Sequence, residues 1–88
     1  MKILDGFIVR KVGDDNVVVP IGERSKEFHG MVKLNETATF MWNFFSESEH
    51  SKDECVSALM SEYDVEKDVA EADVQSFMDS LLKAGLAK

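Results

Sequence analysis

The sequence contains few cysteines, prolines and glycines, and it has no long uninterrupted hydrophobic run. Its 88 residues include one cysteine, one proline and five glycines, and 44% of them are hydrophobic. One cysteine cannot form an internal disulfide, which fits a reducing compartment, so we expect the protein in the cytoplasm. No apolar run is long enough to cross a bilayer, and Asp5 and Gly6 interrupt the apolar start, so neither a membrane segment nor a signal peptide is expected. Residues 1–88 are expected to form one domain.

Positive charge is scarce in the second part of the chain. Residues 34–88 contain four Lys/Arg against twelve Asp/Glu, for a net charge of −8, whereas residues 1–33 contain six against five, for a net charge of +1. Binding to phosphate backbones requires clustered positive charge, and an acidic surface repels them. The charge distribution therefore argues against nucleic acid as a partner.

Reactive groups are few and scattered. His29 and His50 have no cysteine or second histidine at ligand spacing, so no metal site is expected. Cys55 falls in the first turn of an expected helix, but a lone cysteine with no histidine nearby is more typical of a core residue than of a nucleophile. The sequence has no glycine-rich phosphate loop and no nucleophile elbow. From the sequence we therefore expect no catalytic residues and no cofactor site, and we expect that the protein is not an enzyme.

The first third of the chain has the pattern of β-strands. Residues 7–12 and 17–19 are rich in β-branched residues and flank the turn cluster 13–16, which predicts a hairpin with a four-residue loop ended by Pro20. After a polar connection over residues 21–26, a third strand is expected over about residues 27–34, with Gly30 as a candidate bulge. An unbroken alternation places Phe28, Val32 and Leu34 on one face and Met31 and Lys33 on the other.

Three helices are expected after the strands, and each has a boundary signal. Asn35 is a good N-cap for the first helix, Ser51 and Glu54 form a capping box that starts the second at about Lys52, and Gly85 ends the third, which covers about residues 66–84. Apolar residues at helical spacing predict one buried face for each helix. These residues are Ala38, Met41, Trp42 and Phe45 in the first helix, Val56, Leu59, Met60 and Tyr63 in the second, and Val74, Phe77, Met78 and Leu81 in the third.

The predicted order of elements is β-β-β-α-α-α. This order indicates an α+β domain in which a small antiparallel sheet packs on a three-helix bundle. The arrangement is similar to a winged helix whose three strands come first in the chain.

Several short motifs of this sequence occur in the order found in one known family. Leu34-Asn35 precedes the first helix with Trp42, and Asp73-Val74-x-x-Phe77 with Leu81 and Gly85-Leu86 marks the last helix. From about Gly6 to Leu86 the chain resembles the PqqD family of pyrroloquinoline quinone biosynthesis. This family is also described as the peptide-recognition element of ribosomally synthesised, post-translationally modified peptides.

The resemblance implies a peptide chaperone that does no chemistry. Such a protein binds the leader segment of a precursor peptide by β-strand addition and presents the peptide to a modifying enzyme, often a radical S-adenosylmethionine enzyme. The resemblance places the groove between the third strand and the third helix, with Val74 and Phe77 as its floor. The peptide-binding residues that it implies are Phe28, Met31, Val32, Lys33, Leu34, Val69, Asp73, Val74 and Phe77.

Two points stay open at this stage. The connection over residues 22–27 is longer than in the shortest family members, which leaves the register of the third strand open. The resemblance also does not say whether the pathway makes pyrroloquinoline quinone or another modified peptide.

Two other classes of function fit parts of the pattern. A winged-helix transcription regulator fits the order of elements, but the acidic third helix lacks the basic stripe that such proteins use. A small enzyme is disfavoured because no cluster of reactive groups is present.

Overall fold

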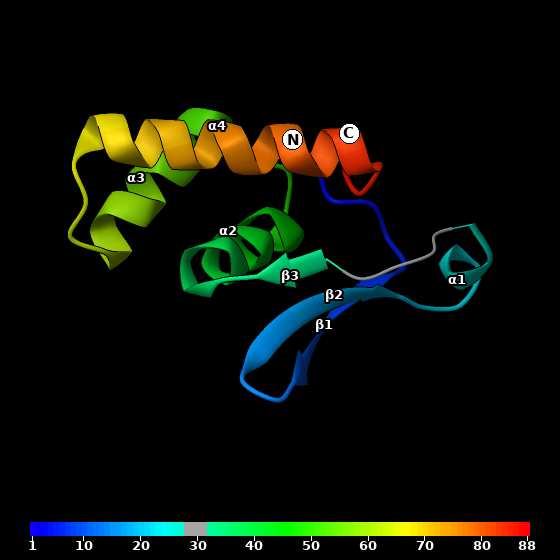
Figure 1. The fold of residues 1–88 in the computed structure, drawn as a ribbon. Coiled ribbons are helices and arrows are strands. Elements are labelled where there is room, and N and C mark those ends of the chain that lie inside the picture. The colour runs from blue at the N-terminus through cyan, green and yellow to red at the C-terminus, as the bar shows by residue number, and fades with distance from the viewer. Residues whose placement is uncertain (28–31) are drawn as a thin grey trace.

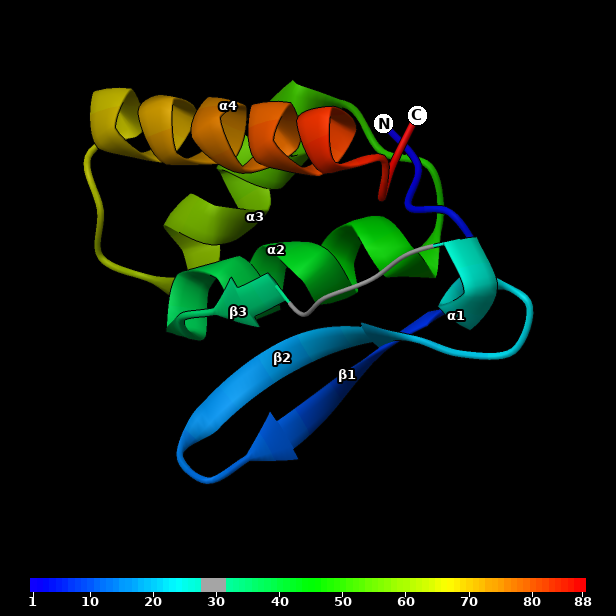
Figure 2. The ribbon, with the colours of Figure 1, turned by 45° about the vertical axis from the view of Figure 1, so that its right-hand side comes forward.

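A three-stranded antiparallel sheet lies against a group of three helices in the computed structural model, which describes residues 1–27 and 32–88 (Figures 1 and 2). The predicted α+β class, with strands followed by helices, is confirmed. The strand order in the sheet is β1-β2-β3, and α2, α3 and α4 pack on one another beside it. The elements are β1 (Phe7–Val12), β2 (Asp15–Pro20), α1 (Arg24–Glu27), β3 (Val32–Leu34), α2 (Glu36–Glu47), α3 (Lys52–Glu62) and α4 (Lys67–Ala84).

The hairpin of β1 and β2 closes more tightly than the sequence predicts. Val12 pairs with Asp15, so the turn consists of Gly13 and Asp14 alone, and the expected four-residue loop is wrong. Gly13 has φ 64°, a left-handed conformation that suits the first central position of a two-residue hairpin turn. The pairing also extends β2 toward its start, where the Asn16 side chain donates a hydrogen bond to Thr39 Oγ1 at 3.3 Å. The hairpin is thereby joined to α2.

The connection after β2 contains a short helix that the sequence analysis missed. Helix α1 covers Arg24–Glu27, so Glu27, expected to begin the third strand, instead ends this helix. The Ser25 hydroxyl donates to the Gly22 carbonyl at 2.6 Å, a local bond that favours a turn over an extended chain. The described part of the third strand is Val32–Leu34. The predictions for Phe28, Gly30 and Met31 lie outside the described residues.

The helix boundaries follow the predicted capping residues. Asn35 Oδ1 accepts a hydrogen bond from the Ala38 N–H at 2.8 Å, and Ser51 and Glu54 form the reciprocal capping box. The backbone N–H of Ser51 and the side chains of His50 and Ser51 stabilise the Glu54 carboxylate and lower its pKa. Gly85 adopts the left-handed conformation with φ 79° at the end of α4. All three predicted caps are confirmed.

The core lies between the sheet and the three long helices. Trp42 is buried as predicted, but Met60 is 38% exposed, and its predicted place in the core is wrong. Helix α3 packs against both α2 and α4, so its buried face is centred on the residues around Cys55 and not on Met60. The largest fully buried side chains are Phe45, Leu59, Leu81, Leu86, Val18, Val74 and Cys55.

The two ends of the chain form a small antiparallel bridge that holds the C-terminal end of α4. Ile3 pairs with Ala87, and the Leu4 N–H donates to the Leu86 carbonyl at 2.9 Å. The ends lie side by side in both views (Figures 1 and 2). Because Ile3, Leu86 and Ala87 are all buried, the bridge is packed against the core. It fixes one end of α4 relative to the start of the hairpin.

Burial makes Cys55 a poor nucleophile. The thiol is fully buried, and this burial raises its pKa to about 11. At pH 8 we expect folded protein to react with iodoacetamide about a hundredfold more slowly than protein unfolded in urea, because far less thiolate is present. The thiol's contribution to stability is complete below pH 9 and is lost as the pH rises toward 11, since the unfolded state ionises first. Equal reaction rates in both states would contradict the burial of Cys55.

Phe77 and Asp73 lie on the same helix but should differ strongly in their contribution to stability. Phe77 is 8% exposed and its ring stacks on Phe45 with centroids 6.4 Å apart, whereas Asp73 is exposed. Phe77→Ala should therefore lower the free energy of unfolding by about 3–5 kcal/mol. Asp73→Ala should change it by less than about 0.5 kcal/mol. Urea unfolding of both variants measures this, and an unchanged Phe77→Ala protein would mean that another face of α4 is buried.

Candidate functional site

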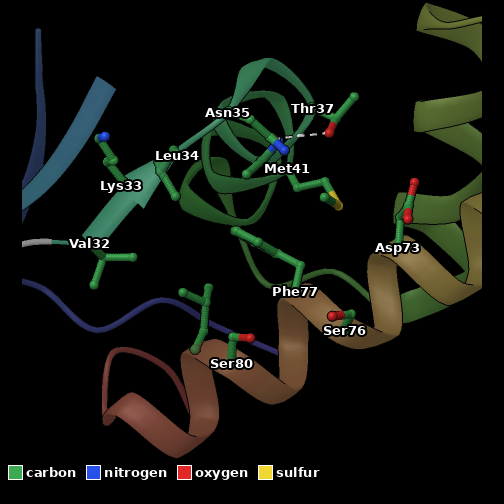
Figure 3. A pocket seen from close by; sticks show the side chains of 12 residues that line it. Val32, Lys33, Leu34, Asn35, Thr37, Met41, Asp73, Ser76, Phe77 and Ser80 are labelled. Carbon is green, nitrogen blue, oxygen red and sulfur yellow. Dashed lines mark hydrogen bonds between the residues drawn. The ribbon is translucent and has the colours of Figure 1, made fainter. Parts of the chain in front are cut away.

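A hollow with an apolar floor lies between β3 and α4 (Figure 3). One edge of β3 pairs with β2, and in the described part of the chain its other edge has no partner strand. The groove along this free edge has a volume of about 400 Å³. Its lining residues are Val32, Lys33, Leu34, Asn35, Thr37, Ala38, Met41, Asp73, Ser76, Phe77, Ser80 and Leu81.

The side chains of β3 alternate between the two faces of the sheet. Leu34 is buried in the core, Val32 is half-buried, and Lys33 is exposed. The ammonium group of Lys33 lies 3.4 Å from Asp15, its ion-pair partner on β2. The predicted sidedness of these three β3 residues is therefore confirmed. The inner face of β3 is therefore apolar, and the charge of Lys33 lies on the outer face of the sheet.

Apolar side chains from two helices form the floor of the groove. Met41 comes from α2, and Phe77 and Leu81 come from α4, and all three are buried. Figure 3 shows the Phe77 ring directed toward Leu34 and Met41. Because Phe77 also stacks on Phe45, the floor is continuous with the core and is rigidly held.

The exposed wall of the groove is polar and carries one negative charge. Asp73, Ser76 and Ser80 stand at positions three and four apart on α4, which places them on one side of the helix. Neighbouring groups on α4 are engaged elsewhere: Gln75 donates a hydrogen bond to Asp79 at 2.8 Å, for example. Among the residues that the structure describes, no cation pairs with Asp73. Its carboxylate is thus available to a ligand.

The structure gathers about half of the predicted site residues around this groove. Val32, Lys33, Leu34, Asp73 and Phe77 line it, and their role as peptide contacts stays a prediction.

The other predicted residues do not line the groove. Val74 is completely buried behind the floor. Val69 is 47% exposed, and it lies one helical turn before Asp73, beyond the end of the groove. Phe28 and Met31 fall outside the described residues.

Several groove residues were not identified from the sequence. Ser76 and Ser80 follow Asp73 at helical spacing, so the position of Asp73 was a signal that could have found them. Met41 and Leu81 were assigned to the core, and they serve as both core and floor. Asn35, Thr37 and Ala38 line the groove because α2 begins directly after β3.

A second, more polar hollow adjoins the end of β3 at Leu34 and Asn35. It lies between the hairpin turn and α2, and Asp14, Asp15 and Glu36 contribute its carboxylates. Burial, together with Glu36 and Glu62, raises the pKa of the Tyr63 hydroxyl in its wall. This end of β3 therefore lies in a negative environment.

The imidazole, thiol and carboxylate groups of the described residues do not gather into a metal site. Across residues 1–27 and 32–88, no group of three or more His, Cys, Asp or Glu side chains could hold a metal ion. His50 stacks on Phe44 with centroids 4.1 Å apart, and its ring nitrogens contact Ser48 at 3.1 Å and Glu54 at 3.5 Å. These contacts join the end of α2, through Phe44, to the start of α3, through Glu54. No described helix is long and apolar enough to pass through a membrane.

Comparison with known proteins agrees with this architecture. The structure of TbiB1 in complex with the TbiA(beta) leader peptide is similar to this fold, with a TM-score of 0.76 and 23% sequence identity. The similarity covers 100% of this chain and 95% of that one, and it shows a shared fold. No curated protein is significantly similar to the chain in sequence. The family described as Coenzyme PQQ synthesis protein D (PqqD) matches residues 16–87, which contain all of β2 except its first residue, β3 and the long helices. The chain therefore belongs to the PqqD family.

Proposed function

We propose that this protein binds the leader segment of a ribosomally made precursor peptide in the groove between β3 and α4. One observation carries the proposal: the unpaired edge of β3 opens into a groove of about 400 Å³ with an apolar floor. An extended peptide would add to the sheet as a fourth strand, and backbone hydrogen bonds to β3 would supply much of its affinity. Alternate side chains of the peptide would enter the groove and supply specificity.

The proposed contacts divide into three groups by their chemistry. The backbone of Val32, Lys33 and Leu34 would pair with the peptide, and the Asp73 carboxylate would accept hydrogen bonds from it. Phe77 would contact apolar peptide side chains from below, with Val74 supporting it from the core. We retain Phe28, Met31 and Val69 as proposed peptide contacts.

The family and the shared fold support a leader peptide as the ligand. TbiB1, which has the same fold, was solved in complex with a leader peptide. The sequence match to the PqqD family covers the strand and the helix that form the groove. Both observations favour an extended peptide over a small molecule in this site.

The protein's contribution to the reaction would be positional. A chaperone that holds the leader raises the effective concentration of the core peptide at a modifying enzyme, without breaking or making a bond itself. We propose a radical S-adenosylmethionine enzyme as that partner and the cytoplasm as the location. Residues 1–88 would act as one peptide-binding domain with no cofactor or metal of its own.

The charges on α3 and α4 do not support the alternative function as a winged-helix transcription regulator. Helices α3 and α4, which would contain a recognition helix, carry more Asp and Glu than Lys. Neither helix contains an arginine, the residue that most often reads guanine in the major groove. We therefore retain the peptide-binding proposal alone.

Titration with a leader peptide tests the binding mode. The leader of a precursor peptide encoded beside the protein's own gene should shift the backbone amide signals of β3 and α4 together in isotope-labelled protein. In calorimetric titrations, folded Asp73→Ala protein should bind the same peptide more weakly, because a charge-assisted hydrogen bond is lost. Shifts confined to α3, with unchanged affinity of Asp73→Ala, would contradict the proposed groove.

A further inference from the structure

The strand and the helix that bound the groove run in opposite directions. The ribbons of β3 and α4 run in opposite directions (Figures 1 and 2), and Figure 3 shows β3 passing from Val32 to Leu34 while α4 passes it from Asp73 to Ser80. Asp73 therefore lies at the Leu34 end of the groove, where Thr37 also lies, and Ser80 lies at the Val32 end (Figure 3). The groove has two chemically different ends.

This polarity fixes the direction of an added strand. Both pairings in the sheet are antiparallel, and antiparallel pairing is slightly more stable per residue than parallel pairing. A peptide antiparallel to β3 runs parallel to α4. Its N-terminal part then lies beside Asp73, and its C-terminal part lies beside Ser80 and Leu81.

The spacing of the groove residues matches that of alternate peptide side chains. Asp73, Phe77 and Leu81 are each four residues apart on α4, and four helical residues rise about 6 Å. Two residues of an extended strand rise about 6.7 Å. Three successive inward-facing side chains of the peptide therefore meet the carboxylate first, the Phe77 ring next, and the Leu81 end of the groove last.

The charges around the groove favour a cation at the first of these positions. Among the described residues that line it, only Asp73 and Lys33 are charged, and Lys33 is already paired with Asp15 on the outer face of the sheet. The positive end of the α2 dipole lies nearby, but Asn35 caps it and Glu36 stands in its first turn. The second hollow adds negative potential at the same end through Asp14 and Glu36, since Asp15 is neutralised by Lys33.

From these observations we infer the sequence pattern of the segment that the groove accepts. The pattern, read from N- to C-terminus, is Lys or Arg, any residue, then a large apolar residue, any residue, and a second apolar or small residue. The cation pairs with Asp73, the large apolar side chain covers Phe77 and Met41, and the last side chain lies near Ser80, Leu81 and Val32. This inference rests on the proposed function and adds the ligand's register and charge to it.

Selection from a phage-displayed library of random 15-residue peptides tests the pattern. Peptides enriched on the wild-type protein should carry Lys or Arg two positions before a large apolar residue. On Asp73→Lys protein, the same selection should enrich Asp or Glu at that position. Asp79→Lys is the matched control, since Asp79 is an exposed carboxylate of α4 that does not line the groove, and it should enrich the wild-type pattern.

The contribution of the Asp73 charge can be measured from the affinity of one enriched peptide for wild-type and variant protein. Asp73→Asn removes the charge and keeps the shape, so it should weaken binding about two- to fivefold, the range for an exposed ion pair. The difference between the two proteins should vanish in 1 M salt, where the charge is screened. A matched peptide with the cation moved to two positions after the apolar residue should bind wild-type protein no better than it binds Asp73→Asn.

The outcomes separate this inference from the proposed function. Enriched peptides that shift β3 and α4 amides but lack the cation, or carry it after the apolar residue, would overturn the pattern and leave peptide binding intact. Selection of the wild-type pattern by Asp73→Lys protein would likewise overturn the pattern and leave peptide binding intact. If no peptide is enriched, or if enriched peptides bind away from β3, the proposed function fails and this inference fails with it.

Discussion

The structure depends on one constraint: α4 must pack firmly on the core while leaving the free edge of β3 uncovered. An unpaired strand edge normally invites unwanted pairing, and proteins restrict such edges by shortness, charge or cover. Here the described edge is only three residues long, and it lies between the first turns of α2 and the wall of α4. A narrow extended chain fits between these walls. We propose that this geometry favours a peptide over a second folded sheet.

Two features hold α4 in the position that the groove requires. Its buried face includes Val74 and Leu81, and Phe77 stacks on the Phe45 ring of α2. At its C-terminal end, the left-handed Gly85 turns the chain so that Ala87 pairs with Ile3. A domain of this size has limited stability, so a ligand that binds only the folded state should raise it measurably. The proposed binding and the stability of the fold would thus be linked through the same helix.

Local signals in the sequence predicted the parts of the fold that depend on near neighbours. The caps at Asn35, Ser51 and Gly85 each act within a few residues, and all three were predicted correctly. The long-range bridge between Ile3 and Ala87 was missed, because no local pattern encodes it. Met60 was misassigned because helical spacing alone does not show that α3 packs against two helices at once.

The candidate site was predictable to a different extent. Asp73 and Phe77 were identified through family resemblance, since an acidic residue on an acidic helix has no distinguishing pattern of its own. Ser76 and Ser80 line the groove for geometric reasons that appear only when α4 is placed beside β3. The opposite directions of these two elements, which give the groove its polarity, are a property of the tertiary fold.

The central claim is that a peptide joins the free edge of β3 as a strand, and an N-methyl scan of the leader peptide tests it most directly. Methylation removes one backbone donor at a time, and in an added strand only every second N–H points at β3. The account predicts affinity losses of about tenfold or more at alternate residues of the bound segment and small effects between them. Losses that recur every three to four residues, or that are equal at every position, would contradict it.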